Sequence, residues 1–405
     1  MTPTSTHERR LLSIQPVRDG GGSEHALIRM LGQLRGDGWE CHVALPGPAR
    51  LEADYATAGA VLHVVGMPRL TTSGSPARWV IFALAWPVVV LRLWWLARRV
   101  GADVVHTNSL HSWYGWAAAA LARRPHVWHA RELVEQSRLA LRVERFLTRH
   151  FADQVVAASR AVAAQLDAPR VIVVTDEVDE TRFSPRKAGC FRSRVGVGDD
   201  VPLVGSAARI DTWKGFDVLL DALPAMQRAR PELQLIIAGP PVGGKEDYAA
   251  VLAARAGASR GAHWLGHRED MADLFADLDV FVQVSTNPEP FGLVLVEALA
   301  SGTPVVAGAE GGPVEILAGA GSSAGRLVPP GDPAALAAAV LELLPTTSST
   351  AIRRARQPLR QAAPTRFSEI FDAVLQERAP TSSQPSRSKS SGGEPRPQKR
   401  SRGAP

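Results

Sequence analysis

Short runs of branched apolar residues alternate with helix-length segments along nearly the whole chain, and this alternation restricts the possible folds more than any other feature. Each run suits one strand and each intervening segment suits one helix, which is the pattern of parallel sheets with crossover helices. The chain has 405 residues, enough for two or three domains. We therefore predict an α/β protein built from doubly wound, Rossmann-like sheets.

The predicted strands form two series separated by a polar stretch. Residues 175–200 interrupt the apolar pattern with one proline and several glycines. We predict a first Rossmann-like domain at 1–178, a linker at 179–198 and a second domain at 199–350, with a central cleft between the two. The first series is 11–17, 40–45, 61–65, 103–107, 126–129, 154–158 and 171–174, and the second is 203–207, 233–238, 263–265, 280–284 and 304–307.

One more amphipathic segment and a polar tail follow the second series, and the segment falls within 351–378. After Pro364, residues 366–378 place apolar side chains on one helical face. Residues 379–405 contain no aromatic or branched apolar residue, so we expect a disordered tail. The tail carries a net charge of +5 out of the chain's +6, which leaves a nearly neutral body and argues against nucleic-acid binding.

The number of cysteines and the polarity of the first ten residues indicate the cellular compartment. Cys41 and Cys190 are too few for a disulfide-stapled secreted scaffold or a Cys-rich zinc module. Residues 1–10 are polar, and the apolar run after them is too short for the core of a signal peptide. We therefore expect a cytoplasmic protein.

The segment from Trp79 to Ala97 is apolar except for Arg92, and a helix of that length would match a bilayer core of about 30 Å. A membrane crossing here would separate strands that the pattern assigns to one sheet, so we do not predict one. Two interpretations remain, a helix buried against the sheet or a helix resting on a lipid surface. The side chains that suit a lipid surface are Trp86, Trp94, Trp95, Arg92, Arg98 and Arg99.

The motif that begins at Asn287 follows a predicted strand and enters a predicted helix. Glu289 is held in the loop between two prolines, and Glu297 lies inside the helix. A glutamate within the helix can accept two hydrogen bonds from a ribose, and one in the loop can accept a sugar hydroxyl. The positive end of the helix suits an anion. The backbone amides at that end belong to Gly292, Leu293 and Val294.

Charged and polar side chains follow several other strands. Arg209 and Lys214 come after the first strand of the second series, where a planar fork and a point charge suit a diphosphate. The turn with Gly21 and Gly22 lacks the spacing of a dinucleotide fingerprint, which disfavours NAD, but its glycines let the backbone approach a ligand, and we expect both to bind it. Because the carboxyl ends of parallel strands meet at one edge, we expect the polar side chains of the first series at the cleft mouth. These are His106, Asn108, Ser109, His111, His129 and Arg131. For any one of the histidines a hydrogen-bonded structural role is an equal alternative, but as a set they favour a site.

Taken in order, these pieces resemble the retaining nucleotide-sugar glycosyltransferases of family 4, which have the GT-B fold of two Rossmann-like domains. The resemblance covers the chain from Leu11 to the helix around Phe367 and leaves out only the tail. The matching pieces are the Gly-Gly-Ser-Glu at 21–24, Asp-Val-Val-His at 103–106, Val-Val-Ala-Ala-Ser at 155–159, Arg-Phe-Ser-Pro at 182–185, Arg209 with Lys214-Gly215, Ile-Ala-Gly-Pro at 237–240, Leu-Gly-His-Arg at 265–268, the stretch from Glu289 to Glu297, Gly-Gly-Pro-Val-Glu at 311–315 and Leu-Val-Pro-Pro-Gly-Asp at 327–332.

The resemblance implies a role for each matching residue. Arg209 and Lys214 would hold the donor diphosphate and Glu297 the ribose, and the backbone around His267 and Arg268 would hold the base. Glu289 would take the sugar together with the backbone of Phe291, Gly292, Leu293 and Val294. We expect Gly21 and Gly22 to bind this donor as well. The family's last helix usually crosses back to the first domain, which fits 351–378. In one departure from the family, Asn108 stands where many members carry a second histidine, and we expect Asn108 and His111 to share its role.

The predicted activity is transfer of a hexosyl unit from a UDP- or GDP-sugar to a hydroxyl acceptor with retention at the anomeric carbon, in cell-envelope, polysaccharide or glycolipid synthesis. No cofactor and no metal is expected, and the Asp277 and Asp279 pair is interpreted as structural. The acceptor would be lipid-linked, which would place the protein peripherally at the inner face of the membrane. Two alternatives are a sugar-nucleotide epimerase or phosphorylase of similar fold, and a non-catalytic nucleotide-sugar-binding scaffold.

Overall fold

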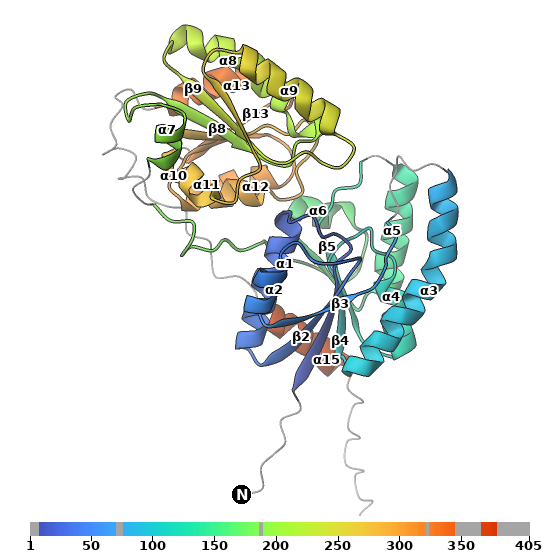
Figure 1. The fold of residues 1–405 in the computed structure, drawn as a ribbon. Helices are drawn as coiled ribbons and strands as arrows, with labels where there is room; N and C mark the ends of the chain where they lie inside the picture. Colours follow the sequence, from blue (N-terminus) through green and yellow to red (C-terminus); the bar gives the residue numbers. More distant parts are fainter. Residues whose placement is uncertain are drawn as a thin grey trace, which may run out of the picture.

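A computed structural model describes residues 8–69, 76–135, 137–185, 189–320, 324–344 and 366–378. Within these ranges the chain forms two all-parallel sheets, one in each half, and the second half lies above the first in Figure 1. This arrangement confirms the prediction of an α/β protein with two doubly wound halves. The predicted tail at 379–405 lies outside the described residues.

The first sheet has the strand order β3-β2-β1-β4-β5-β6-β7. Its central strands are buried on both faces, because helices cover both sides of a parallel sheet; in β1, for example, Leu11, Leu12 and Ile14 have no exposed surface. The strands are β1 (Arg9–Ile14), β2 (Trp39–Leu45), β3 (Ala60–Val64), β4 (Val104–Thr107), β5 (His126–Ala130), β6 (Gln154–Ala157) and β7 (Val171–Val173).

Two layers of helices cover this sheet. One face carries α1 (Gly22–Gly36), α2 (Glu52–Thr57) and α15 (Phe367–Arg378). The other carries α3 (Pro76–Val100), α4 (Gly115–Ala122), α5 (Arg138–Phe151) and α6 (Arg160–Gln165), and Figure 1 shows α3, α4 and α5 together at one side. The last helix, α15, therefore packs on the first sheet although it follows the second half in the chain. Asp372 of α15 accepts a hydrogen bond of 2.6 Å from Arg9 of β1.

The second sheet has the order β10-β9-β8-β11-β12-β13 and is also covered on both faces. Its strands are β8 (Leu203–Ala207), β9 (Gln234–Ala238), β10 (Ala262–Gly266), β11 (Val280–Gln283), β12 (Val305–Gly308) and β13 (Gly325–Val328). One face packs α8 (Phe216–Ala229), α9 (Glu246–Ala258) and α13 (Pro333–Leu343), and the other packs α7 (Cys190–Arg194), α10 (Met271–Asp277), α11 (Leu293–Ala300) and α12 (Gly312–Ala320). The strand β13 was not predicted.

Part of the predicted linker belongs to the core of the second half. Phe183 and Phe191 are buried there, and Arg192 is buried against Asp279 with an N to O distance of 2.8 Å. Asp277 accepts the backbone amide of Phe191 at 2.7 Å. The Asp277 and Asp279 carboxylates therefore fix α7 to the sheet, which agrees with the structural role predicted for them.

The helix α3 is buried on one face and exposed on the other, so the structure is compatible with the core packing considered for Trp79 to Ala97 and leaves the lipid contact a prediction. Along one face, Leu93 and its neighbours are buried against the first sheet, and Trp86 and Trp94 are half-buried on the same cluster. On the opposite face, Leu84, Leu91 and Trp95 are 72%, 53% and 54% exposed, and Trp79 is 50% exposed near the start of the helix, where the residues on all sides are exposed. The helix is long and apolar enough to cross a membrane, yet its buried face packs on the first half of the protein.

Candidate functional site

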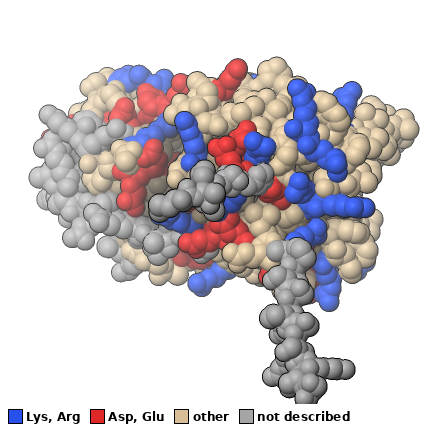
Figure 2. Space-filling view, turned by 90° about the horizontal axis from the view of Figure 1, so that it is seen from below, with Lys and Arg blue, Asp and Glu red and all other residues tan. Residues whose placement is uncertain are grey.

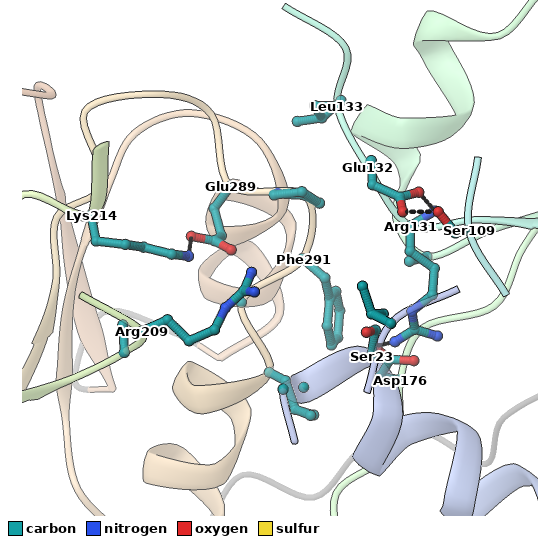
Figure 3. Close-up of a pocket in the computed structure, with 18 of the residues that line it drawn as sticks. Ser23, Ser109, Arg131, Glu132, Leu133, Asp176, Arg209, Lys214, Glu289 and Phe291 are labelled. Atoms are coloured by element: carbon teal, nitrogen blue, oxygen red, sulfur yellow. Dashed lines mark hydrogen bonds and ion pairs between the residues drawn. The ribbon is translucent and has the colours of Figure 1, made fainter. Parts of the chain in front are cut away.

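A cleft with a volume of about 400 Å³ lies between the two halves, at the carboxyl ends of their strands. The first half contributes the loop between β1 and α1 and the segments after β4 and β5. The second half contributes the segments after β8 and β11. Figure 3 shows Lys214, Arg209 and Glu289 on one side of this cleft and Ser23, Arg131 and Asp176 on the other, with Phe291 between them.

An ion pair between Lys214 and Glu289 organises the second-half wall of the cleft. The Lys214 Nζ lies 2.7 Å from Glu289 Oε2, and the two side chains are only 10% and 12% exposed. The same oxygen accepts hydrogen bonds from Gln283 at 3.0 Å and Ser285 at 2.9 Å. Lys214 also lies 3.9 Å from the ring centre of Trp213, a cation–π contact. Both predicted donor-site residues are thus held in place before any ligand binds.

The backbone around Lys214 requires a glycine at the next position. The short 3-10 helix η1 (Thr212–Lys214) ends at Gly215, whose φ is +76°. A Cβ atom at this position would lie 1.8 Å from the carbonyl oxygen of Val284, at the end of β11. Only glycine therefore allows the Lys214 loop to approach the loop that carries Glu289.

Two helix N-termini face each other across the cleft. The N-cap of α1 is Gly21 and the N-cap of α11 is Gly292, and neither has a side chain that could cap the helix. A Cβ atom placed on Gly22 would lie 3.8 Å from the Leu293 side chain, so the two ends almost touch. Helix N-termini bind anions through their backbone N–H groups and the helix dipole. The fold therefore creates a site for a negatively charged group at this point.

Arg209 lies at the boundary between the halves. Its Nη1 donates a hydrogen bond of 2.6 Å to Asp19 Oδ2, which belongs to the loop before α1. The Arg209 side chain is 47% exposed and Asp19 is 38% exposed, so this ion pair is open to solvent. Of the two predicted diphosphate cations, Lys214 is thus bound within its own half, whereas Arg209 reaches the other half.

His111 lies on the first-half wall and is held by a buried glutamate. Its Nδ1 is 2.6 Å from Oε1 of Glu144, a residue of α5 that is 1% exposed. The hydrogen bond to Glu144 and the charges of Glu132 and Glu144 outweigh burial and raise the pKa of His111 to about 9. At neutral pH the ring is therefore an imidazolium that donates hydrogen bonds.

Asn108 lines the cleft, but its amide nitrogen already donates hydrogen bonds to groups of the protein. Nδ2 donates to Gln15 Oε1 at 2.7 Å and to the Ser23 carbonyl oxygen at 3.1 Å, which ties the end of β4 to the start of α1. Its Oδ1 is buried without a hydrogen-bond partner in the described part of the chain. The structure thus brings Asn108 and His111 to the same wall and gives each a different environment.

The expectation that His106 and His129 reach the cleft mouth is wrong. Both rings are buried, at 0% and 2% exposure, and both pack against Phe367 of α15. Burial lowers the pKa of His106 to about 3 and lowers the pKa of His129 well below its usual range. These histidines remain neutral and form part of the contact with the last helix. The sequence pattern of the strand ends did not reveal that α15 would cover them.

Three further predicted residues do not line the cavity. His267 and Arg268 follow β10, where Arg268 pairs with Asp270, its Nε 2.8 Å from Oδ1. Glu297 is half-buried on α11, and the charged group that most favours its ionised form is Arg29 of α1. Burial outweighs Arg29 and raises the pKa of Glu297 to about 7. The donor-binding roles expected for these three residues therefore stay predictions.

Several residues of the cleft were not assigned by the sequence. Arg69 and Trp213 line it. The Glu132 carboxylate, also in the lining, accepts hydrogen bonds from the Ser109 hydroxyl at 2.5 Å and from the Leu110 amide at 2.8 Å. Glu144 stands out in the sequence only as the single acid on the otherwise basic segment 138–151, which does not identify its partner. In the residues the structure describes, we find no group of three or more His, Cys, Asp or Glu that could hold a metal ion.

Comparison with known families gives two matches that divide the chain as the sheets do. Residues 20–179 match the model described as Glycosyltransferase Family 4, and residues 191–361 match the one described as Glycosyl transferases group 1. The match to the first model begins at the β1–α1 loop, and the second contains Arg209, Lys214, Glu289 and Glu297.

Curated relatives include D-inositol 3-phosphate glycosyltransferases. The one from Streptomyces coelicolor is 32% identical over 70% of this chain and 66% of its own length, and the one from Stackebrandtia nassauensis is 34% identical over 52% and 53%. The lipopolysaccharide core biosynthesis mannosyltransferase LpsB of Rhizobium meliloti is 29% identical over 50% and 64%. The chain thus spans about half to two thirds of the length of these relatives.

Solved structures share the whole architecture. Anabaena Alr3699/HepE, in complex with UDP and glucose, superposes with a TM-score of 0.72 and 25% identity over 91% of this chain and 98% of that one. WaaG, a glycosyltransferase involved in lipopolysaccharide biosynthesis, gives a TM-score of 0.62 at 17% identity over 85% and 92%, which shows the fold alone.

The ion pair of His111 and Glu144 predicts a pH-dependent contribution to stability. Since the folded-state pKa of His111, about 9, lies above the unfolded value of about 6.5, the pair stabilises the fold fully below pH 6.5 and loses this effect as the pH rises through 9. Glu144→Gln should weaken the decrease in urea midpoint between pH 6.5 and pH 9. Because His111 is partly exposed, the wild-type decrease should be modest. An identical decrease in wild type and Glu144→Gln would contradict the assignment.

Proposed function

We propose that this chain, which belongs to the glycosyltransferases of group 1 and family 4, transfers a hexosyl unit from a nucleoside-diphosphate sugar to a hydroxyl acceptor with retention at the anomeric carbon. The observation that carries the proposal is the arrangement at the cleft: Lys214 paired with Glu289, beside two helix N-termini that point at the same space. Such an arrangement suits a diphosphate next to a polar, uncharged group.

The donor diphosphate would bind to the second-half wall. Lys214 and Arg209 supply the two cations, and the amides at the start of α11 supply directed N–H donors. The structural relative HepE is described in complex with UDP and glucose, which supports a UDP-sugar as the donor. By family resemblance, the ribose would contact Glu297 and the base would contact the backbone near His267 and Arg268.

The transferred sugar would contact Glu289. In the described part of the chain all three hydrogen bonds to this carboxylate reach Oε2, which leaves Oε1 to accept from a sugar hydroxyl. Gln283, Ser285 and Lys214 fix the orientation of Glu289, so this hydrogen bond is preorganised. The backbone from Phe291 to Val294 would complete the sugar site.

In the proposed reaction the bond between the anomeric carbon and the β-phosphate oxygen breaks, and the acceptor oxygen bonds to the same face of that carbon. The leaving phosphate takes the acceptor proton. Negative charge grows on the diphosphate as the bond breaks, and Lys214, Arg209 and the α11 amides stabilise that charge because they are fixed before the reaction begins. His111, as an imidazolium, would donate a hydrogen bond from the opposite wall.

We propose that the acceptor is lipid-linked and that α3 rests on the inner face of a membrane. Leu84, Leu91 and Trp95 form an exposed apolar face, Trp79 is exposed near the start of the helix, and the helix contains no acidic residue. Figure 2 shows blue Lys and Arg side chains gathered with few red ones at the right of the view, the side where α3 and α5 lie in Figure 1. Exposed arginines beside exposed tryptophans suit anionic headgroups above an apolar boundary. Those on α3 are Arg78, Arg92, Arg98 and Arg99.

Removal of either donor cation should weaken nucleotide binding and turnover. We expect Lys214→Met and Arg209→Ala to bind UDP about 10- to 100-fold more weakly, since each removes a charge-assisted hydrogen bond, and the nearly buried Lys214 should show the larger effect. Calorimetric titration with UDP measures this, with Arg228→Ala, an exposed arginine of α8, as the control. Unchanged UDP affinity in both donor-site variants would refute the site.

The two glutamates should differ in what they affect. Glu289→Gln should leave UDP affinity nearly unchanged and reduce turnover, because its partner is the sugar. Glu297→Gln should weaken UDP itself, because ribose remains in that ligand. Since burial raises the pKa of Glu297 to about 7, wild-type UDP affinity should also fall between pH 8 and pH 6, and Glu297→Gln should make that fall smaller, leaving the part that comes from protonation of the UDP phosphate, whose pKa is about 6. Equal losses of UDP affinity in both variants would show that the division of roles is wrong.

Membrane contact predicts binding to anionic vesicles. The protein should co-sediment with vesicles of phosphatidylglycerol and phosphatidylcholine, and Trp79→Glu with Trp95→Glu should release it without lowering its melting temperature, because both side chains are exposed. The matched control is Val251→Glu, which changes an exposed apolar residue on α9 of the other half. Failure of the wild type to sediment, or equal sedimentation of the double variant, would contradict the proposal.

A further inference from the structure

The loop between β1 and α1 places a carboxylate where the donor phosphate would be recognised. Asp19 Oδ2 accepts the 2.6 Å hydrogen bond from Arg209, and Asp19 Oδ1 accepts a hydrogen bond of 3.1 Å from the backbone amide of Gly21, the N-cap residue of α1. One carboxylate therefore bridges a helix N-terminus in the first half and a donor cation in the second half. An arginine and a helix N-terminal amide are the groups that bind phosphate.

Hydrogen bonds on both sides of Asp19 hold this loop in place. Gly20 has a φ of +72°, and its amide donates a hydrogen bond of 2.9 Å to Glu24 Oε2. Glu24 is fully buried and accepts a second hydrogen bond from the Tyr55 hydroxyl at 3.2 Å. Arg18 donates to the carbonyl oxygen of Pro48 at 3.0 Å. Asp19 is thus aimed at Arg209 by a buried anchor on one side and a backbone contact on the other.

The two ion pairs of the donor site differ in a way that matters for exchange. Lys214 and Glu289 are nearly buried and belong to the same half. The Glu289 carboxylate also accepts hydrogen bonds from two further side chains. Arg209 and Asp19 are exposed and belong to different halves. An exposed pair contributes little free energy, so an incoming anion can replace its carboxylate. The pair of Arg209 and Asp19 is therefore the exchangeable one.

We propose that Asp19 is an internal substitute for the donor diphosphate. In the ligand-free chain its carboxylate occupies Arg209 and the Gly21 amide. The nucleotide displaces it on binding, and Asp19 returns to both groups as the nucleoside diphosphate leaves after transfer. By competing for Arg209 and the Gly21 amide, Asp19 lowers the affinity of the site for the nucleoside diphosphate product. The inference rests on the proposed function, because it assumes that Arg209 binds the diphosphate.

The competition predicts that removal of the Asp19 charge tightens nucleotide binding. Asp19→Asn keeps the size of the side chain, and we expect it to bind UDP about two- to fivefold more tightly than the wild type, the range that an exposed ion pair allows. The gain should appear as slower dissociation of UDP. Uridine, which has no phosphate, should bind both proteins equally.

The experiment compares wild type, Asp19→Asn, Asp19→Ser and Asp54→Asn. Asp54 is an exposed acid on α2 outside the cleft, so Asp54→Asn makes the same change in net charge at another place in the first half. Calorimetry gives the dissociation constants for UDP, GDP and uridine, and stopped-flow displacement gives the UDP dissociation rate. Melting temperatures of the four proteins establish that all are folded. The expected result is tighter UDP binding in both Asp19 variants, with Asp54→Asn like the wild type.

Three results would overturn the inference. Unchanged or weaker UDP binding in both Asp19 variants would show that Asp19 does not compete with the diphosphate. An equal gain in Asp54→Asn would show a general charge effect, and an equal gain for uridine would show a change of loop shape. If no protein, wild type included, binds UDP or GDP, the proposed donor site fails and the role of Asp19 fails with it. If the wild type binds UDP and the Asp19 variants bind it with the same affinity, only the role of Asp19 is refuted and the donor site stands.

Discussion

The uncapped N-termini of α1 and α11, which point at each other from the two halves, are the constraint on which the rest of the site depends. Each helix leaves N–H groups without an intrahelical partner, and the N-cap residues Gly21 and Gly292 have no side chain that could accept from them. This concentration of partial positive charge favours an anion at this point of the cleft. In the ligand-free chain Asp19 meets it in part, through the Gly21 amide.

The cations and carboxylates of the cleft follow from that constraint. Lys214 close to a helix end would be repelled by the dipole if it stood alone, and Glu289 compensates it at 2.7 Å. Arg209 is compensated by Asp19, and Arg131 by Asp176 on the opposite wall. Each ion pair holds a charged side chain in a fixed position in the cleft before a ligand binds. The wall is therefore preorganised for a ligand that carries both a diphosphate and hydroxyl groups.

Much of the architecture could be predicted from the sequence, because parallel strands buried on both faces appear as continuous apolar runs. The strand at 203–207 matches β8 residue for residue, and the position of Glu289 beside Lys214 follows from the rule that strand ends share one edge. The short strand β13 was missed because its sequence, Gly-Arg-Leu-Val, has too few apolar residues to stand out.

The errors came from contacts between segments distant in sequence. His106 and His129 occupy strand ends, as a site residue would, but α15 covers them after a connection of hundreds of residues. Phe191 lies in a polar stretch and is nevertheless fully buried, because Asp277 and Asp279 anchor its helix to the second sheet. The role of Glu144 depends on the side of α5 that faces His111, which periodicity alone does not define.

A crystal structure of the chain with UDP would test the central claim most directly. The account predicts that the diphosphate lies on the second-half wall of the cleft, beside the N-terminus of α11, with its oxygens about 3 Å from Lys214, from Arg209 and from the first amides of α11. Asp19 should no longer contact Arg209. A diphosphate bound elsewhere, or one that projects into solvent while the pair of Asp19 and Arg209 stays intact, would contradict it.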